Sequence, residues 1–307
     1  MILLHRTLIR NSMSNKHSTS KTIDTVVDDI YDTLSVLCDE ETLNIPDDYI
    51  EEFGERMKDT LRNWSTPKTQ STGLRMSNVG RPLRRLWYDL KSGVPIYNRT
   101  HPSVFIKFLY GHMLEELVLL FVRLSGHRVE DEQKEIEIDG VKGHMDCTID
   151  GEVVDIKTAS SFAFKKFKDG TLHDDDPFGY MAQLSGYEAA QGTSEGGFLA
   201  LNKESGELAL YRPGDMLKVN VSSKIKRVRA AEQLDSPPKR CYTPVPEGKK
   251  GNLRLPRECT FCPHKIECYA DANNGEGLRT FMYSNGPKYL VRVTAVPKVP
   301  ELENEVA

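Results

Sequence analysis

The chain has 307 residues, of which 28% are charged and 38% hydrophobic, and its formal net charge is −4. These values are typical of a soluble globular protein large enough for one sizeable core, and the net charge gives no sign of nucleic-acid binding. No apolar run is long enough to span a membrane, so we expect no membrane partner. Six cysteines without a recognisable signal peptide favour a reducing cytoplasm and metal ligation over disulfide bonds.

Helices are predicted at the beginning of the chain, ahead of any core strand. Apolar residues recur at helical spacing from Ile23 to Cys38. Asp47 and Asp48 stand where the N-cap of a second, charged helix belongs, and that helix is expected to end near Trp64. Cys38, like Cys147, is expected to be buried and unreactive.

A further helix is predicted around Pro82, because proline suits the first helical turn. Its beginning is basic, with Arg81, Arg84 and Arg85. These arginines form either a solvated face or a surface that binds phosphate groups, and the second interpretation makes them candidate DNA-binding residues.

The strongest predicted helix extends from Ser103 to Ser125, with apolar residues spaced by three and four. Glu115 and Glu116 interrupt this apolar stripe. Two adjacent acids cannot both lie on one narrow solvent face, so we expect Glu115 to point towards the strands that follow. The alternative is that both acids lie at the edge of the buried stripe.

Residues 143–157 carry the most informative pattern. Asp150-Gly151 predicts a tight turn between two short strands. Asp146 lies on the first strand, whereas Asp155 and Lys157 lie on the second, where a spacing of two places them on one face. Charges on an otherwise apolar strand are costly unless they are paired or bind a metal. Two acids can hold a divalent cation and a lysine can offset charge on a phosphate, whereas the alternative is a solvated surface salt bridge.

The neighbouring segments complete a helix-and-strand pattern. Alternation up to Ile138 and the turn at Asp139-Gly140 predict another hairpin, whose second strand extends from Val141 to Ile149. After Lys157, three phenylalanines alternate with lysines that include the candidate DNA-binding residues Lys165 and Lys166. Basic residues among aromatics can follow a nucleic-acid backbone and stack on its bases, although the phenylalanines can equally be core residues.

A helix from Tyr180 to Gln191 is predicted next, and it places Gln183 and Tyr187 on one face. Two strands, 197–202 and 207–211, and a helix over 213–234 follow. Between residues 218 and 257 there are 11 lysines and arginines against 3 acids. This local excess of positive charge is typical of a nucleic-acid-binding surface.

Four cysteines gather near the C-terminal end of the sequence. Cys259, Cys262 and Cys268 have the C-x2-C-x5-C spacing with which thiolates grip one metal from a tight turn. Cys241 is the expected fourth ligand, and His264 is a possible substitute. Four thiolates suit Zn²⁺ and an iron–sulfur cluster such as [4Fe-4S] equally well.

Together these motifs resemble the PD-(D/E)xK nuclease superfamily, in particular the RecB-like and phage exonucleases. The family order is a helix acid, a strand acid, an acid-x-Lys pair, and Gln-x-x-x-Tyr on a helix. Here that order is filled by Glu115, Asp146, Asp155 with Lys157, and Gln183 with Tyr187. The cysteine set is similar to the metal-binding cysteines of RecB-like enzymes, but its first member stands at Cys241 instead of before the core.

The resemblance implies an α/β, restriction-endonuclease-like core in which helices flank a mixed central sheet. It implies that Glu115, Asp146, Asp155 and the carbonyl of Ile156 hold Mg²⁺ or Mn²⁺. Lys157 would position or activate the attacking water, and Gln183 and Tyr187 would steady the site or the DNA. Replacing Lys157 or Asp146 by alanine is expected to abolish cleavage and leave the fold intact.

The expected organisation is a lead-in, N-terminal helices, a nuclease core, a metal-binding segment and a C-terminal tail, at residues 1–22, 23–72, 73–235, 236–275 and 276–307. The part of the tail after Lys298 is acidic and is expected to be disordered. The expected function is a metal-dependent DNA exonuclease in phage-type recombination, repair or genome processing. Its partners would be DNA and a single-strand-binding or annealing protein, in the cytoplasm or in a host cytoplasm. The alternatives are a non-cleaving DNA-binding module and a metal-dependent hydrolase for another substrate.

Overall fold

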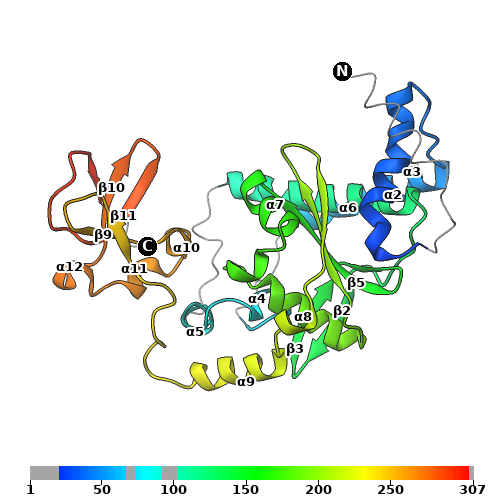
Figure 1. The fold of residues 1–307 in the computed structure, drawn as a ribbon. Coiled ribbons are helices and arrows are strands. Elements are labelled where there is room, and N and C mark those ends of the chain that lie inside the picture. The colour runs from blue at the N-terminus through cyan, green and yellow to red at the C-terminus, as the bar shows by residue number, and fades with distance from the viewer. Residues whose placement is uncertain (1–20, 67–72, 92–101, 304–307) are drawn as a thin grey trace.

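A five-stranded mixed sheet lies at the centre of the computed structural model, which describes residues 21–66, 73–91 and 102–303 (Figure 1). The strand order is β1-β4-β5-β6-β7. Only β5 and β6 are parallel, and the other neighbours pair antiparallel. The strands are β1 (Val129–Glu130), β4 (Cys147–Ile149), β5 (Glu152–Ala159), β6 (Gly197–Asn202) and β7 (Leu208–Tyr211). The prediction of a mixed sheet is therefore confirmed.

Helices cover both faces of this sheet, which buries the alternating side chains of β5. Val154 and Ile156 pack in one cluster with apolar residues of α2 and α6, whereas Val153 packs in the other with residues of α4, α7 and α8. These helices are α2 (Val26–Leu34), α4 (Met76–Val79), α6 (Ser103–Leu124), α7 (Ser161–Lys168) and α8 (Tyr180–Gln191). Every residue of β6 is buried, as expected for a strand covered on both faces.

A two-stranded ribbon of β2 (Lys134–Ile138) and β3 (Val141–Met145) continues into the sheet. The sequence predicted one strand up to residue 149, but the chain leaves the ribbon at Asp146 and pairs with different neighbours in β4. Both predicted turns are confirmed, since Asp139-Gly140 and Asp150-Gly151 all have positive φ angles. Asp146 therefore lies at the junction between ribbon and sheet.

Several predicted boundaries change for local reasons. The N-cap of α3 (Asp47–Ser65) is Pro46, so the two aspartates occupy its first turn instead. The basic helix α9 (Val221–Glu232) begins later than predicted because the side chain of Asn220 caps it, accepting a hydrogen bond from the Ser223 amide at 2.9 Å. Cys38 is exposed, contrary to expectation, whereas Cys147 is fully buried.

The segment after residue 275, expected to be a C-terminal tail, is folded instead. Residues 279–302 form three strands that join two earlier ones in a second five-stranded sheet, ordered β12-β10-β11-β9-β8. This sheet and three short helices form what we call the C-terminal module: β8 (Val245–Glu247), β9 (Asn252–Arg254), α10 (Arg257–Thr260), α11 (Lys265–Cys268), α12 (Ala272–Gly275), β10 (Arg279–Tyr283), β11 (Gly286–Arg292) and β12 (Glu301–Leu302). Phe281 and Leu290 are fully buried in it, which gives these strands an apolar face.

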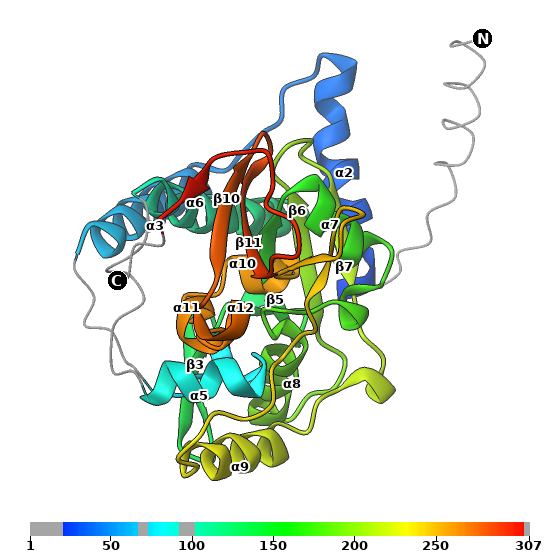
Figure 2. The same cartoon turned by 90° about the vertical axis from the view of Figure 1, so that its left-hand side faces the viewer.

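The C-terminal module lies beside the core, on the side where α5 (Leu83–Lys91) lies (Figures 1 and 2). The expected lead-in lies almost wholly outside the described residues. Among the helices of the described ranges, none is both long and apolar enough to cross a membrane.

A close backbone contact joins the loop before α5 to the start of α8. A Cβ atom on Gly80 would lie 2.1 Å from the carbonyl oxygen of Gly179. We therefore expect Gly80→Ala to lower the free energy of unfolding by about 1–3 kcal/mol in urea titrations, because backbone atoms must move apart.

Gly54→Ala is the matched control, because no atom lies within 4 Å of the added carbon on α3. It should be neutral or raise the free energy of unfolding by about 0.5–1 kcal/mol, since alanine favours helix. Equal effects of the two substitutions would show that the contact between Gly80 and Gly179 does not constrain the fold.

Candidate active site

An ion pair on the central strand β5 forms the middle of the site. The strand alternation places Asp155 and Lys157 on one face, as predicted, and Lys157 Nζ lies 2.5 Å from Asp155 Oδ2. Asp155 is completely buried, and neither of its carboxylate oxygens accepts any hydrogen bond beyond this ion pair. Such a carboxylate is unusual, because buried charged groups ordinarily have their hydrogen-bonding capacity satisfied.

A second carboxylate is attached to the same strand through the backbone. The amide N–H of Ile156 donates a hydrogen bond to Asp146 Oδ2 at 2.7 Å. Burial raises the pKa of Asp146, and the charge of Asp155 raises it further, while Lys157 and the Ile156 amide lower it; the net pKa is about 7. Asp155 is therefore close enough to Asp146 to disfavour ionisation of Asp146.

Lys157 remains an ammonium in this environment. Burial lowers its pKa, but the charges of Asp155 and Asp146 outweigh that effect and raise it above the usual range. The ammonium also lies 4.9 Å from the centre of the Tyr180 ring, a cation–π distance. A charged lysine suits the stabilisation of negative charge better than proton abstraction.

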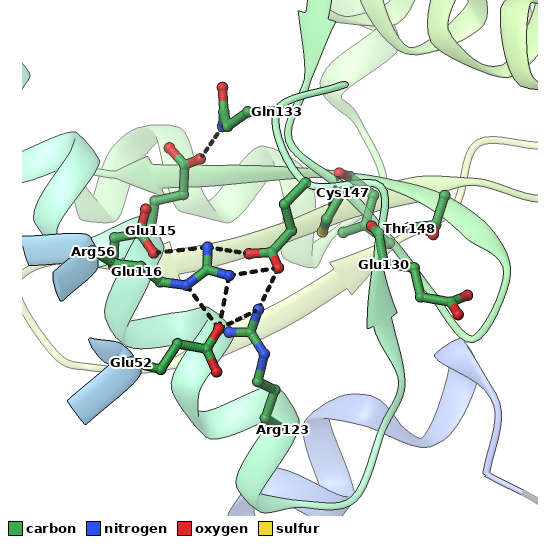
Figure 3. A network of polar contacts seen from close by, with 11 residues as sticks. Glu52, Arg56, Glu115, Glu116, Arg123, Glu130, Gln133, Cys147 and Thr148 are labelled. Atoms are coloured by element: carbon green, nitrogen blue, oxygen red, sulfur yellow. Dashed lines mark hydrogen bonds and ion pairs between the residues drawn. The ribbon is translucent and has the colours of Figure 1, made fainter. Parts of the chain in front are cut away.

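Helix α6 directs its two adjacent acids to different places, as Figure 3 shows. Glu116 lies 3.7 Å from Arg56 of α3. Glu115 points towards the strand acids, and burial followed by the charge of Asp146 raises its pKa well above the usual range. The expectation that Glu115 faces the strands agrees with this arrangement.

Gln133 connects Glu115 of α6 to Asp146, and no sequence pattern pointed to this residue. Its side-chain amide donates to Glu115 Oε1 at 3.0 Å, and its backbone N–H donates to the carbonyl oxygen of Asp146 at 3.0 Å. The preceding residue, Glu132, is held at 2.5 Å by both Arg56 and Arg123. This network ties the loop that carries Gln133 to α3 and α6 (Figure 3).

Gln183 and Tyr187 lie on one face of α8, as predicted, and both are buried. Gln183 Nε2 donates to the Tyr187 hydroxyl at 2.8 Å, and that hydroxyl donates to the His144 carbonyl at 2.7 Å. The pair therefore fixes the end of β3, two residues before Asp146.

The three carboxylates of the candidate site do not converge on a single point. Within the described ranges, no three His, Cys, Asp or Glu side chains converge as the ligands of a single ion. The chemistry of the set still fits a hard divalent cation, because carboxylates are hard oxygen ligands and the buried oxygens of Asp155 have no hydrogen-bond donor besides the Lys157 ammonium.

The four predicted cysteines line one cavity of about 300 Å³, which we call the cysteine cavity: Cys241, Cys259, Cys262 and Cys268. Arg84 Nε donates to Cys268 Sγ at 3.1 Å. The backbone amides of Arg84 and Arg85 donate to Cys241, and that of His264 donates to Cys262. Burial raises the pKa of Cys259 to about 12, so a bound cation would be needed to make this thiol ionise. His264 Nε2 forms a hydrogen bond with Asp89 Oδ1 at 2.7 Å, so a metal at this residue would use Nδ1, and its role as a substitute ligand stays a prediction.

The basic residues predicted to bind DNA have partners within the protein. Arg84 donates to the Pro238 carbonyl at 2.6 Å, and Arg81 and Arg85 lie 3.7 and 3.9 Å from Asp89. On α7, Lys165 pairs with Asp169 at 2.6 Å and Lys166 pairs with Asp175. Arg84 thus joins the core to the C-terminal module, and contact of these side chains with DNA stays a prediction.

Known proteins resemble this chain only in structure. No protein-family profile matches it, and no curated protein sequence matches it. Among solved structures, SSO0001 is 19% identical over 71% of this chain and 96% of its own, with a TM-score of 0.39. The alkaline exonuclease LHK-Exo from Laribacter hongkongensis is 16% identical over 52% and 87%, with a TM-score of 0.38. A phage-related exonuclease from Haemophilus somnus 129PT is 14% identical over 56% and 95%, with a TM-score of 0.31.

The ion pair between Asp155 and Lys157 should give a coupling energy in the free energy of unfolding. Lys157→Met should lower the free energy of unfolding by about 3–5 kcal/mol, because it leaves a fully buried carboxylate without its partner.

The double variant Asp155→Asn/Lys157→Met should recover much of that loss, since no uncompensated charge remains. Urea unfolding of the two single variants and the double variant measures the coupling. Additive losses would mean that the two side chains do not stabilise each other.

Proposed function

We propose that this protein is a divalent-metal-dependent DNA nuclease. The observation that carries the proposal is the arrangement around β5, where a buried, hydrogen-bond-deficient Asp155 is paired with Lys157 and adjoins Asp146. Two acids whose pKa values are raised by burial and by neighbouring carboxylates, beside a charged amine, favour binding a cation and a phosphate over a purely structural role. The basic stretch from residue 218 to residue 257 supports a polyanionic substrate.

Glu115, Asp146, Asp155 and the carbonyl of Ile156 would hold Mg²⁺ or Mn²⁺. When bound, such an ion would supply positive charge that polarises a phosphodiester and lowers the pKa of a water molecule. The chain itself contributes Lys157, whose ammonium orients the attacking water and offsets charge on the phosphate oxygens. The hydrogen bond from Gln133 positions Glu115, and the pair of Gln183 and Tyr187 positions the backbone at His144. These contacts would keep the carboxylates in place for the ion.

The finer assignment is an exonuclease in phage-type DNA recombination, repair or genome processing. It would work in a cytoplasm, including that of a host, with DNA as substrate. A single-strand-binding or annealing protein would supply or use the processed strand.

We expect linear DNA to be degraded in Mn²⁺ or Mg²⁺ and to stay intact in EDTA. Asp146→Asn and Asp155→Asn keep the side-chain shapes and should lower cleavage at least about 100-fold, because each removes a charged oxygen from the cation site. In the same variants, Mn²⁺ should raise the melting temperature less than it does in the wild-type protein.

Asp59→Asn, an exposed change on α3, is the control and should leave cleavage and the Mn²⁺ effect unchanged. Cleavage that persists in Asp155→Asn would refute the nuclease assignment. DNA binding without cleavage by the wild-type protein would instead support a non-cleaving binding module.

We further propose that the four cysteines hold a metal centre, either a [4Fe-4S] cluster or Zn²⁺. The thiols line one cavity, and N–H donors directed at sulfur favour the thiolate form. A bound centre would crosslink the C-terminal module to the loop that precedes it.

Anaerobically purified protein should be brown if the centre is a cluster, or colourless with one zinc per chain if it is Zn²⁺. Cys262→Ser should lose the metal and lower the melting temperature, because metal binding contributes folding energy. Cys38→Ser, at an exposed position remote in sequence, should change neither property. Metal-free wild-type protein with an unchanged melting temperature in Cys262→Ser would contradict this proposal.

A further inference from the structure

Three phenylalanine side chains line the cysteine cavity and are nevertheless largely exposed to solvent. Phe162, Phe178 and Phe261 are 60%, 55% and 80% exposed. They come from α7, from the segment before α8 and from the C-terminal module, so separate parts of the chain bring them to one place. Single exposed aromatic residues are common, but three around one cavity indicate a binding surface.

Positive charges lie over one of these rings, that of Phe162. The guanidinium of Arg257 is 4.4 Å from the centre of the Phe162 ring, and Lys166 Nζ is 5.8 Å from the same ring. Arg85 and Lys265 line the same cavity. Flat apolar rings among cations match a ligand with flat apolar groups on an anionic backbone.

The aromatic surface leads to the candidate active site. Phe178 stacks on Tyr180, with ring centres 5.4 Å apart and planes 20° apart. The Tyr180 ring in turn lies 4.9 Å from the Lys157 ammonium. A ligand on Phe178 is therefore one aromatic residue away from the lysine that would meet the phosphate.

We propose that Phe162, Phe178 and Phe261 form a base-stacking surface for the unpaired strand of a nucleic acid that enters the active site. This inference rests on the proposed nuclease function and adds to it the form of the substrate. Bases inside a duplex are already stacked on one another, so only an unpaired strand offers free ring faces to these side chains. The cations around the rings would meet its phosphates.

The test is a binding measurement without metal, so that cleavage plays no part. Fluorescence anisotropy in EDTA would compare a labelled single-stranded DNA, an abasic strand of equal length and a blunt duplex. Wild-type protein should bind the single strand at least about fivefold more tightly than the abasic strand, because the phosphates are the same and only stacking differs. Phe178→Ala should weaken single-strand binding by roughly 5- to 150-fold and leave abasic binding unchanged.

Two further variants separate stacking from loss of structure. Phe178→Trp keeps an aromatic face and should restore single-strand binding, whereas Phe178→Leu keeps only apolar bulk and should not. Met216→Ala, at a completely exposed position outside the cavity, should bind like the wild-type protein.

Equal binding of the single and abasic strands would overturn the proposal, as would preference for the duplex. It would also fail if Phe162→Ala, Phe178→Ala and Phe261→Ala all bind the single strand like the wild-type protein. These outcomes are independent of the nuclease test, because Asp155→Asn should lose cleavage and keep the preference for the unpaired strand.

Discussion

The ion pair between Asp155 and Lys157 constrains the rest of this structure. A carboxylate with no exposed surface and no other hydrogen-bond donor is costly in a protein core, and the neighbouring ammonium offsets that cost. The pair lies on β5, the middle strand of the central sheet, where apolar side chains surround it. Its position also fixes Asp146, because the amide between the two charged residues donates to that carboxylate. A polar centre thus sits where packing alone would favour apolar residues, and this is common where proteins perform chemistry.

The elements around this centre act mainly as supports. Helix α6 brings Glu115, and α3 keeps the adjacent Glu116 away from the site by offering it Arg56. Gln133 links Glu115 to the backbone of Asp146, and Tyr187 fixes the strand just before that acid. Two of these contacts end on backbone carbonyl oxygens, those of Asp146 and His144, and such fixed geometry would suit a site that holds its carboxylates in place for a cation and a substrate.

The C-terminal module is linked to the core through Arg84 of α5. Arg84 reaches from α5 to Cys268 and to the Pro238 carbonyl, so a residue that resembles a surface cation is a structural link. The cysteine cavity lies at this junction, and exposed phenylalanines line it as well. A metal centre at the cysteines and an unpaired strand on the phenylalanines would therefore depend on the same docking of the module. Under these two proposals, integrity of the metal centre would influence access of a strand to Lys157.

The spacing of neighbouring residues in the sequence was enough to predict several local features of this protein. The turns at residues 139–140 and 150–151, the shared face of Asp155 and Lys157 and that of Gln183 and Tyr187 depend on a few adjacent residues, so periodicity predicts them. Tertiary structure decided the meeting of Glu115 with Asp146, the role of Gln133 and the internal partners of Arg84. It also decided that the expected tail forms strands, because Phe281 and Leu290 are buried in the second sheet and β12 pairs with β10. Those features depend on contacts between distant segments, which no local pattern encodes.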